Sequence, residues 1–568
     1  MTEGFRNDIV PSFRPEHSEV PESSGIVDSR FRRNNKGRAE VFLPSQECSC
    51  LRRSDEKRQV SMPPLPDALK IGGNTLVSRL LGFVRDLVIA RLFGVSEGTD
   101  AFFVALRIPN LLRRLFVEGV FAAACVPVLE RQRRTAPPAA LRRAVDCLFG
   151  TFGLYLFGLS LAGSWAAPLF VLFFAPGFGL ESPQGVLAAE MVRITIPYLF
   201  FIALTALAGS LLNLHERFGI PAFTPVLLNL SILGCAFFLA PQLDPPILAL
   251  ACGIFLGGLV QFLIQLPALK RIGLLPRPRF CPQHPAVRDI LRGLGPTLLS
   301  LSATQVNLLL DSLLASFLLS GSLSWLYYSE RLLEFPLGIL GSALGILILP
   351  RLSRIPRSSS AFSRPIDWGL RWALVLGLPA ALGLFVLAEP IVSTLFHSPA
   401  FGAADIEKTA QSLRAYALGL VPVLFVKILV PAFLSQSELR PPARAARLAL
   451  IVKLSLSLAC LPLGHVGLAL ATSLAALSNA TWLLLKLKQS GFYQPRPGWL
   501  LLVSRVLGAS SILGLVLYYW ADPGGKTYDR FGELIAWILF GVLLYGISFL
   551  LLGGRPGDLR GPEREEDQ

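Results

Sequence analysis

The chain has 568 residues, of which 52% are hydrophobic and only 16% are charged, and its mean hydropathy is +0.55. An average soluble domain carries about 25% charged residues, so this composition excludes an ordinary soluble globular protein, a disordered protein and a disulfide scaffold. The net charge of +15 would suggest a nucleic-acid partner in a soluble domain. Here the basic residues lie between hydrophobic runs, which is where membrane proteins carry them to fix topology. We expect a multi-pass membrane protein with no nucleic-acid partner.

Residues 1–62 form a polar extension rich in Pro, Ser, Arg and Glu. This composition cannot bury enough apolar surface to fold, so the segment is expected to be disordered. It lacks the apolar stretch of a cleavable signal peptide. Because Met62 directly precedes the first hydrophobic run, the extension is either a cytoplasmic tail or the product of an over-long reading of the start codon. Cys48 and Cys50 form a lone C-x-C pair, which predicts no metal site.

Hydrophobic runs after residue 62 predict fourteen membrane-spanning helices, each with the roughly 20 apolar residues that a bilayer requires. Five internal prolines should mark kinks or breaks, which such helices tolerate: Pro109, Pro127, Pro197, Pro296 and Pro336. The predicted spans are 69–93, 99–129, 144–173, 188–213, 220–240, 246–269, 290–319, 323–350, 367–396, 410–434, 445–463, 466–485, 498–520 and 532–553.

The charges of the connecting loops predict the orientation. If the N-terminus is cytoplasmic, 21 of the 24 Lys and Arg counted in the loops fall on the cytoplasmic side. Only Lys408, Lys526 and Arg530 fall outside. Since the bias holds in successive loops, the number of spans should be even and both termini should be cytoplasmic.

A weak internal repeat lies at the ends of the second and eighth predicted spans, which read Val126-Pro-Val-Leu-Glu-Arg131 and Leu349-Pro-Arg-Leu-Ser-Arg354. Two parallel six-helix lobes with a pathway between them would explain it. A chance similarity between two helix ends explains it equally well.

Charged residues inside three predicted spans are the main functional signal. A central arginine costs about 2.5–3.5 kcal/mol on insertion scales, so it needs a water-filled cavity or a partner. At 100° per residue, Arg79 and Asp86 share one face of the first span, and Arg85 points to another. Arg114 and Glu118 are four residues apart and can pair. The residues concerned are Arg79, Arg85, Asp86, Arg91, Arg107, Arg113, Arg114, Glu118, Glu330, Arg331 and Glu334.

Arg79, Arg85, Arg113 and Arg331 outnumber the nearby acids and lie within apolar helices. Guanidinium groups donate paired hydrogen bonds to phosphate oxygens and keep their charge, so these four residues should line a cavity for a lipid with an anionic, phosphate-bearing head group. The alternative is that the arginines only balance neighbouring acids or reach the membrane interface, which we favour for Arg91 and Arg107.

Several long motifs resemble the MurJ (MviN) family of lipid II flippases over residues 69–553. The resemblance implies a fold like that of the multidrug/oligosaccharidyl-lipid/polysaccharide exporter superfamily, which is all-α, with two six-helix lobes around a central cavity and two further C-terminal helices that form a groove for a lipid tail. The motifs are Thr75-Leu-Val-Ser-Arg-Leu-Leu-Gly-Phe-Val-Arg-Asp86, Thr99-Asp-Ala-Phe-Phe-Val-Ala105, Pro109-Asn-Leu-Leu-Arg-Arg-Leu-Phe-Val-Glu-Gly119, Ile220-Pro-Ala-Phe-Thr-Pro225 and Ser324-Trp-Leu-Tyr-Tyr-Ser-Glu-Arg-Leu-Leu-Glu-Phe-Pro336.

The resemblance also implies roles for individual residues. The family's essential cavity arginines match Arg79, Arg85, Arg113 and Arg331, and its functional acids match Asp100 and Glu118. An acid of an ion site described in some members matches Asp311 in the seventh span, and hydroxyls of the eleventh and twelfth spans are offered by Ser455, Ser457 and Thr472. The eleventh span carries no carboxylate, which makes a sodium ion doubtful. No cofactor is implied, and transport would be coupled to the membrane potential or to a cation.

The expected organisation is a polar extension (1–62), two lobes (63–273 and 274–490), two additional helices (491–553) and a cytoplasmic tail (554–568). The expected partners are lipid II, which is the undecaprenyl-diphosphate-linked peptidoglycan precursor, and membrane lipids of the bacterial inner membrane. Two alternatives stay open: an exporter of another polyprenyl-linked oligosaccharide or of drugs, and an integral-membrane enzyme acting on polyprenyl phosphates. The enzyme is disfavoured because all five His lie in loops or in the extension, without a paired acid motif.

Overall fold

The computed structural model describes residues 65–116, 120–135, 137–300, 302–355, 360–520 and 530–554. Within these ranges the chain is helical, and β-structure is limited to one isolated bridge between Ser398 and Phe401. Long apolar runs form helices because a helix satisfies every backbone N–H and C=O group internally, which a membrane interior requires. The predicted all-α fold is confirmed. The polar extension, with Cys48 and Cys50, and the tail beyond residue 554 lie outside the described residues.

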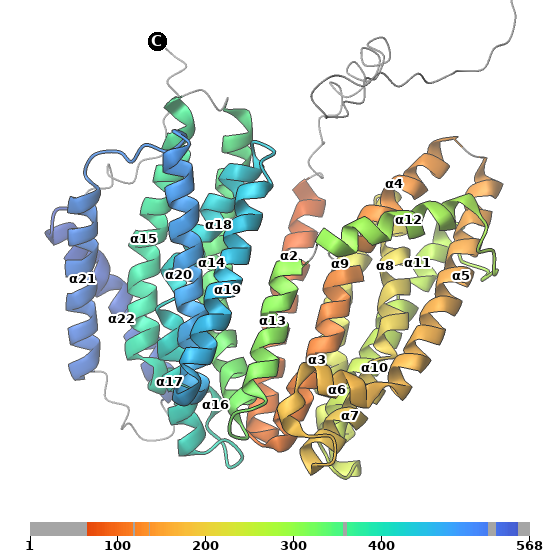
Figure 1. Cartoon of the computed structure of the whole chain (residues 1–568), viewed down its shortest axis with the longest axis horizontal. Helices are drawn as coiled ribbons and strands as arrows, with labels where there is room; N and C mark the ends of the chain where they lie inside the picture. Colours follow the sequence, from red (N-terminus) through yellow and green to blue (C-terminus); the bar gives the residue numbers. More distant parts are fainter. Residues whose placement is uncertain are drawn as a thin grey trace, which may run out of the picture. The chain divides into compact units, whose positions relative to one another are not determined.

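The helices of the first half of the chain pack mainly against one another, and we call α2 to α12 the first group (Figure 1). Within it α9 packs against α2 and α10, and α3 packs against α7. Its members are α2 (Leu65–Phe93), α3 (Glu97–Phe116), α4 (Val120–Thr135), α5 (Pro138–Trp165), α6 (Ala167–Phe174), α7 (Pro183–Thr195), α8 (Tyr198–Leu214), α9 (Gly219–Phe238), α10 (Leu248–Leu263), α11 (Leu266–Arg271) and α12 (Pro285–Ser300).

The remaining helices, α13 to α22, form the second group. Here α14 packs against α15, α17 and α18, and α21 and α22 pack together on the side of α15. The members are α13 (Ser302–Ala315), α14 (Ser322–Arg354), α15 (Ser363–Val386), α16 (Ala388–Phe396), α17 (Ala403–Ala417), α18 (Leu420–Leu434), α19 (Arg440–Ala459), α20 (Gly464–Gln489), α21 (Trp499–Trp520) and α22 (Arg530–Leu551).

Each of the fourteen predicted ranges coincides with one of these helices or with two consecutive ones. In the described ranges nine helical stretches are long and apolar enough to cross a membrane, or ten if the bent pair α17 and α18 counts as one span. The count of fourteen, the orientation and the lobe boundaries therefore stay predictions. Of the five prolines, Pro197 lies at a break, between α7 and α8. The other four lie inside helices that continue past them.

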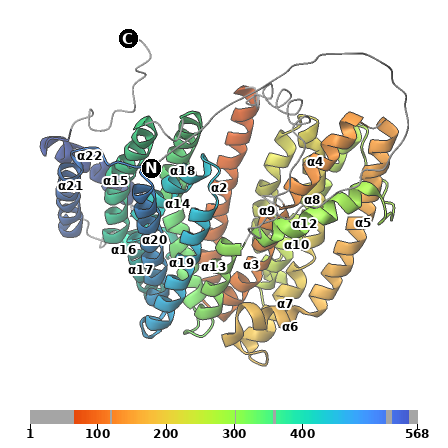
Figure 2. The ribbon, with the colours of Figure 1, turned by 45° about the horizontal axis from the view of Figure 1, so that its top comes forward.

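The two groups meet where α2 ends and α3 and α14 begin. There α14 packs against α3, α16 packs against α2, and α13 packs against α6. Thus α2 is one of the helices of the first group, and α13 one of the helices of the second, that lie at the junction (Figure 2). One continuous apolar core includes residues of both groups at this junction. Tyr328 of α14 illustrates it, since its ring contacts Phe103 of α3, Phe396 of α16 and Phe401, with ring centroids 5.4, 5.2 and 5.7 Å apart.

Candidate functional site

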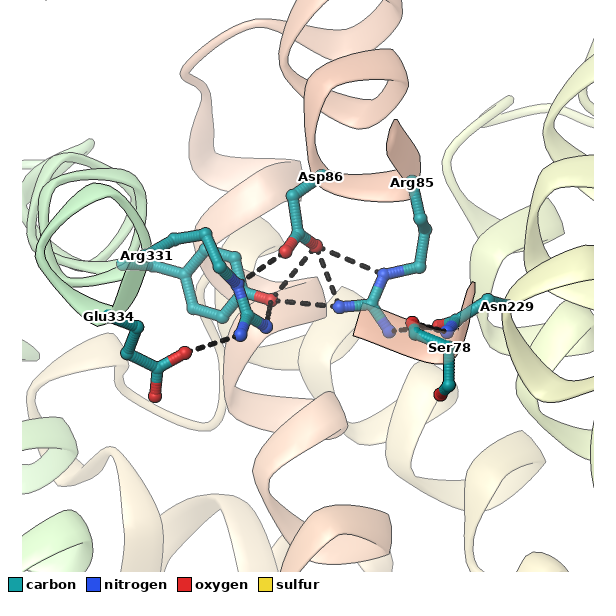
Figure 3. A network of polar contacts seen from close by, with 7 residues as sticks. Ser78, Arg85, Asp86, Asn229, Arg331 and Glu334 are labelled. Atoms are coloured by element: carbon teal, nitrogen blue, oxygen red, sulfur yellow. Dashed lines mark hydrogen bonds and ion pairs between the residues drawn. The ribbon is translucent and has the colours of Figure 1, made fainter. Parts of the chain in front are cut away.

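Two of the predicted arginines meet on one carboxylate between α2 and α14 (Figure 3). The Asp86 side chain is 1% exposed and pairs with Arg85 at 2.7 Å and with Arg331 at 2.5 Å. A buried carboxylate is stable only when its charge is compensated, and here each oxygen contacts a guanidinium. Arg85 and Asp86 are consecutive on α2 and were expected on different faces of the helix, and the long arginine side chain reaches back to the carboxylate of its neighbour.

Tyr327 of α14 completes this contact between the two groups. Its hydroxyl donates to Asp86 at 3.0 Å and accepts from Arg85 Nη2 and Arg331 Nη2, both at 3.1 Å. The Tyr327 ring stacks on Phe103 of α3, with centroids 3.9 Å apart. The tyrosine therefore fixes both guanidiniums relative to α3, and its place within the Ser324–Pro336 motif is the sequence signal that could have identified it.

Asn229 holds the far end of Arg85. Its Oδ1 accepts from Arg85 Nη1 at 3.0 Å, and its Nδ2 donates to the Ser78 carbonyl at 3.2 Å. Sequence reasoning missed this residue. The signal was a buried amide within the apolar run of α9, since such a group has to find a partner inside the protein.

The exposed side of the network adds two more cations. Arg331 Nη1 contacts Glu334 at 2.6 Å, and the Glu334 side chain is half-exposed. Lys427 of α18 interacts electrostatically with both Glu334 and Arg79. Arg79 Nη1 lies 3.2 Å from the position that a Cβ of Gly338 would occupy, so it reaches across to α14.

The charged residues of this network form what we call the arginine cluster, whose members are Arg79, Arg85, Asp86, Arg331, Glu334 and Lys427. The cluster has four cations and two acids.

The other predicted site residues lie elsewhere or are not described. Arg113 of α3 interacts electrostatically with Tyr198 at the start of α8, within the first group. Glu118 lies outside the described residues, as does its predicted pairing with Arg114, whose side chain is not described either. The structure therefore brings Arg85 and Arg331 into contact, places Arg79 close to them, and gives Arg113 a different neighbour.

Asp100 caps the start of α14. The N-cap residue of α14 is Gly321, at φ 95°, which has no side chain to accept a hydrogen bond. Asp100 supplies the missing acceptor from α3, because it accepts from Gly321 N at 2.7 Å, Ser324 N at 2.9 Å and Ser324 Oγ at 2.6 Å. The predicted functional acid thus joins the two groups through a helix N-terminus, where backbone N–H groups and the helix dipole favour an anion.

Arg91 and Arg107 also join the groups. Arg91 donates to the carbonyls of Thr394 at 3.2 Å and Leu395 at 2.8 Å, which belong to the last turn of α16. Arg107 of α3 donates to the Ser312 hydroxyl of α13. Arg91 had been expected to reach the interface or pair with an acid, and it instead satisfies helix-terminal carbonyls.

Asp311, the predicted acid of an ion site, pairs with a lysine. The Lys453 ammonium of α19 lies 2.7 Å from each oxygen of Asp311. Thr472, one of the hydroxyl residues suggested for that site, donates to the Leu468 carbonyl of its own helix at 3.0 Å. Sequence reasoning noted that the eleventh span has no carboxylate but missed Lys453, a single charge within an apolar run.

Another buried acid, Asp367, fixes the loop between α20 and α21. Asp367 of α15 is 0% exposed and accepts from Arg371 Nε at 2.8 Å, Tyr493 OH at 2.9 Å and Trp499 Nε1 at 2.7 Å. Burial, followed by the charge of Asp367, raises the pKa of Tyr493, which keeps its hydroxyl a donor. This cluster attaches α21 to α15 and is structural.

A family model described as "Lipid II flippase MurJ" matches residues 89–531 of the chain. The chain belongs to the MurJ family. The resemblance expected from the motifs is therefore confirmed, and so is a membrane protein with many apolar helices. The "Lipid II flippase MurJ" of Burkholderia cenocepacia is 38% identical over 497 residues, which cover 85% of this chain and 96% of the relative. The "Probable lipid II flippase MurJ" of Vibrio cholerae is 39% identical over 517 residues, covering 88% and 98%.

Solved structures agree with the MurJ assignment. A chain described as "Lipid II flippase MurJ, inward closed conformation" superposes with a TM-score of 0.72 at 26% identity, covering 85% of this chain and 98% of the other. An inward-facing multidrug transporter of the MATE family superposes with a TM-score of 0.59 at 14% identity, covering 73% and 95%. The second likeness concerns the fold alone.

Proposed function

We propose that this protein is a lipid II flippase, a transporter and not an enzyme. It would move the undecaprenyl-diphosphate-linked disaccharide-pentapeptide from the cytoplasmic to the outer face of the bacterial inner membrane by alternating access. Membership of the MurJ family supports the reaction. The observation that carries the mechanism is the arginine cluster, in which permanent cations from both helix groups lie side by side.

The charge of the arginine cluster suits a diphosphate. Four cations face two acids, so two positive charges are available to an anion with two phosphate groups. Guanidinium groups bind phosphate oxygens through paired hydrogen bonds and cannot lose their proton. A drug exporter for organic cations would need the opposite balance.

The two acids of the cluster have different roles in this mechanism. The Asp86 side chain is 1% exposed and holds Arg85 and Arg331 in register, whereas the Glu334 side chain is 50% exposed. An arriving diphosphate would displace Glu334 from Arg331 and leave the buried Asp86 contact in place. Arg331 is then the residue that exchanges an internal carboxylate for the substrate.

The contacts between the helix groups support a state that opens to the cytoplasm. They involve the end of α2 and the starts of α3 and α14. With both termini cytoplasmic, as the loop charges predict, these ends face outward. The outer side would be closed by Asp100, Arg91 and the aromatic rings around Tyr328, and substrate would enter from the cytoplasmic side.

Reconstitution tests the proposal. The full chain would be placed in liposomes with fluorescent lipid II, and movement between leaflets would be measured with a membrane-impermeant quencher. We expect transport by the wild type and at least a tenfold loss for Arg331→Ala, because one charge-assisted hydrogen bond is worth about 1.5–3 kcal/mol. Undecaprenyl phosphate without the sugar serves as the competing substrate. A wild-type protein that moves no lipid II would contradict the proposal.

A double variant separates substrate binding from simple charge balance. If Arg331 only neutralises Glu334, the variant Arg331→Gln with Glu334→Gln should transport as well as the wild type, since no charge is left uncompensated. If Arg331 binds the diphosphate, the double variant should stay as inactive as Arg331→Ala while inserting normally.

A further inference from the structure

A buried charge cluster at α13 and α19 has no role in the mechanism above. It borders the arginine cluster, because its member Glu330 also interacts electrostatically with Glu334. The Lys453 side chain is 3% exposed and that of Asp311 is 15% exposed. Glu330 of α14 interacts electrostatically with both residues and with Arg107 of α3. Four helices from both groups thus contribute charges to one place, although burying charge is costly.

The lysine occupies the position of a coordinated cation. Its Nζ lies 2.7 Å from Oδ1 and 2.7 Å from Oδ2 of Asp311, so the ammonium bridges both carboxylate oxygens. Lys453 and Arg107 offset the charges of Asp311 and Glu330, and Glu334 adds a further negative charge near Glu330. Without Lys453, Arg107 would leave at least one of these negative charges uncompensated.

A further oxygen atom is available on the same helix. Ser457 is 0% exposed, lies one turn after Lys453 on α19, and its hydroxyl has no hydrogen-bond partner among the described residues. Residues four apart share a helix face, so this hydroxyl lies on the side that carries the ammonium. A buried hydroxyl without a partner is costly, and an oxygen of this kind is a ligand that a hard metal cation accepts.

We propose that Asp311 and Glu330 form a site for one monovalent cation and that the Lys453 ammonium is its built-in ligand. This inference rests on the proposed function in one respect: it implies that lipid II transport by this chain needs no free sodium ion. Shortening Lys453 should open the site to a free cation, with the Ser457 hydroxyl as an additional ligand.

Thermal stability of the full chain in detergent tests the site independently of transport. Tm would be measured in NaCl and in choline chloride at equal ionic strength, because choline is too large to replace the ammonium. We expect the wild-type Tm to be the same in both salts. Lys453→Met should melt lower in choline and gain about 1 °C in NaCl at ten times the dissociation constant.

Two further variants make the result specific. Lys453→Met with Asp311→Asn removes both charges and should lose the response to sodium. Lys488→Met removes an exposed lysine from the last turn of α20 and should behave like the wild type in both salts. If Lys453→Met does not accumulate in choline chloride, preparation in NaCl should recover it, and equal failure in both salts contradicts the proposal.

The proposal is overturned if sodium leaves the Tm of Lys453→Met unchanged, or raises that of the wild type equally. A purely structural ion pair predicts the first of these results. In liposomes, lipid II transport by the wild type should be equal in the two salts at a clamped potential. A wild type that moves no lipid II in either salt would contradict the proposed function and leave the stability result as a valid test of the site.

Discussion

Arg85 makes four hydrogen bonds with one guanidinium group. Its Nε and Nη2 reach Asp86 at 3.0 and 2.7 Å, Nη2 also reaches Tyr327, and Nη1 reaches Asn229 at 3.0 Å. The planar fork allows donors to point in three directions at once. A lysine at this position carries the same charge but offers its donors from a single atom.

Arg85→Lys should therefore lose transport by about tenfold or more while inserting normally, because at least one charge-assisted hydrogen bond is lost. Lipid II movement in liposomes is the measurement. Asn229→Ala is the comparison, since of the contacts of Arg85 it removes the one at Nη1 alone, together with the Asn229 bond to the Ser78 carbonyl, and should cost less. Equal activity of Arg85→Lys and the wild type would show that charge alone suffices.

Asp100 provides a prediction about stability. Asp100→Ala removes the acceptor of three hydrogen bonds at the start of α14, so the free energy of unfolding should fall by about 1–2 kcal/mol. Asp100→Asn keeps one acceptor oxygen and should fall less. Thermal unfolding of the purified variants measures both. A stability of Asp100→Ala equal to that of the wild type would rule out the capping role.

The sequence singled out Arg79, Arg85 and Arg331 of the arginine cluster, but not Tyr327 or Asn229, and not which side chains contact one another. Arginines within apolar helices are costly, so their presence alone points to function. The pairing of Asp86 with Arg331 depends on how α2 and α14 pack, and these helices are far apart in the sequence. Lys453 was overlooked because a single lysine in an apolar run has no local partner to explain it.

At the level of helices, the hydrophobic runs predicted well where the helices lie, but poorly whether one predicted span is a single helix or two. All fourteen ranges contain helix, yet several predicted spans are built from two helices, such as α15 and α16, which are joined at Leu387. Most of the prolines expected to mark breaks lie inside continuous helices. The break at Leu387 lies three residues before Pro390, which has no N–H to bond the carbonyl of Val386, and this local signal was not used.

The attachment of α21 to α15 gives a prediction for these elements. Asp367→Ala leaves the buried Arg371 without its carboxylate, so the variant should lose about 3–5 kcal/mol of stability. The loop between α20 and α21 should then be released, and limited trypsin digestion should cut after Lys488. Tyr493→Phe removes one hydrogen bond and should lose only about 1 kcal/mol. Protection of the loop in Asp367→Ala would contradict this account.

For the whole molecule the orientation in the membrane is the testable property. In a cysteine-free background, single cysteines at Gln184 and Asp522 should react with an impermeant maleimide added outside intact cells, and one at Ser359 should not. Asp522 and Ser359 lie outside the described residues, and their sides follow from the loop charges. If the cysteine at position 359 reacted with reagent added outside, the predicted orientation of the spans after the first group would be wrong.

The junction between the helix groups combines two kinds of contact that should evolve differently. Asp100 and Arg91 bind backbone groups of α14 and α16, which substitutions other than proline leave in place. Asp311 and Lys453 bind each other's side chains. A backbone group does not change when its side-chain partner is substituted. Across relatives, Asp100 and Arg91 should therefore each be kept or replaced without a matching substitution elsewhere. Asp311 and Lys453 should instead change together, and a relative that lacks the lysine should be the one that has acquired a dependence on sodium.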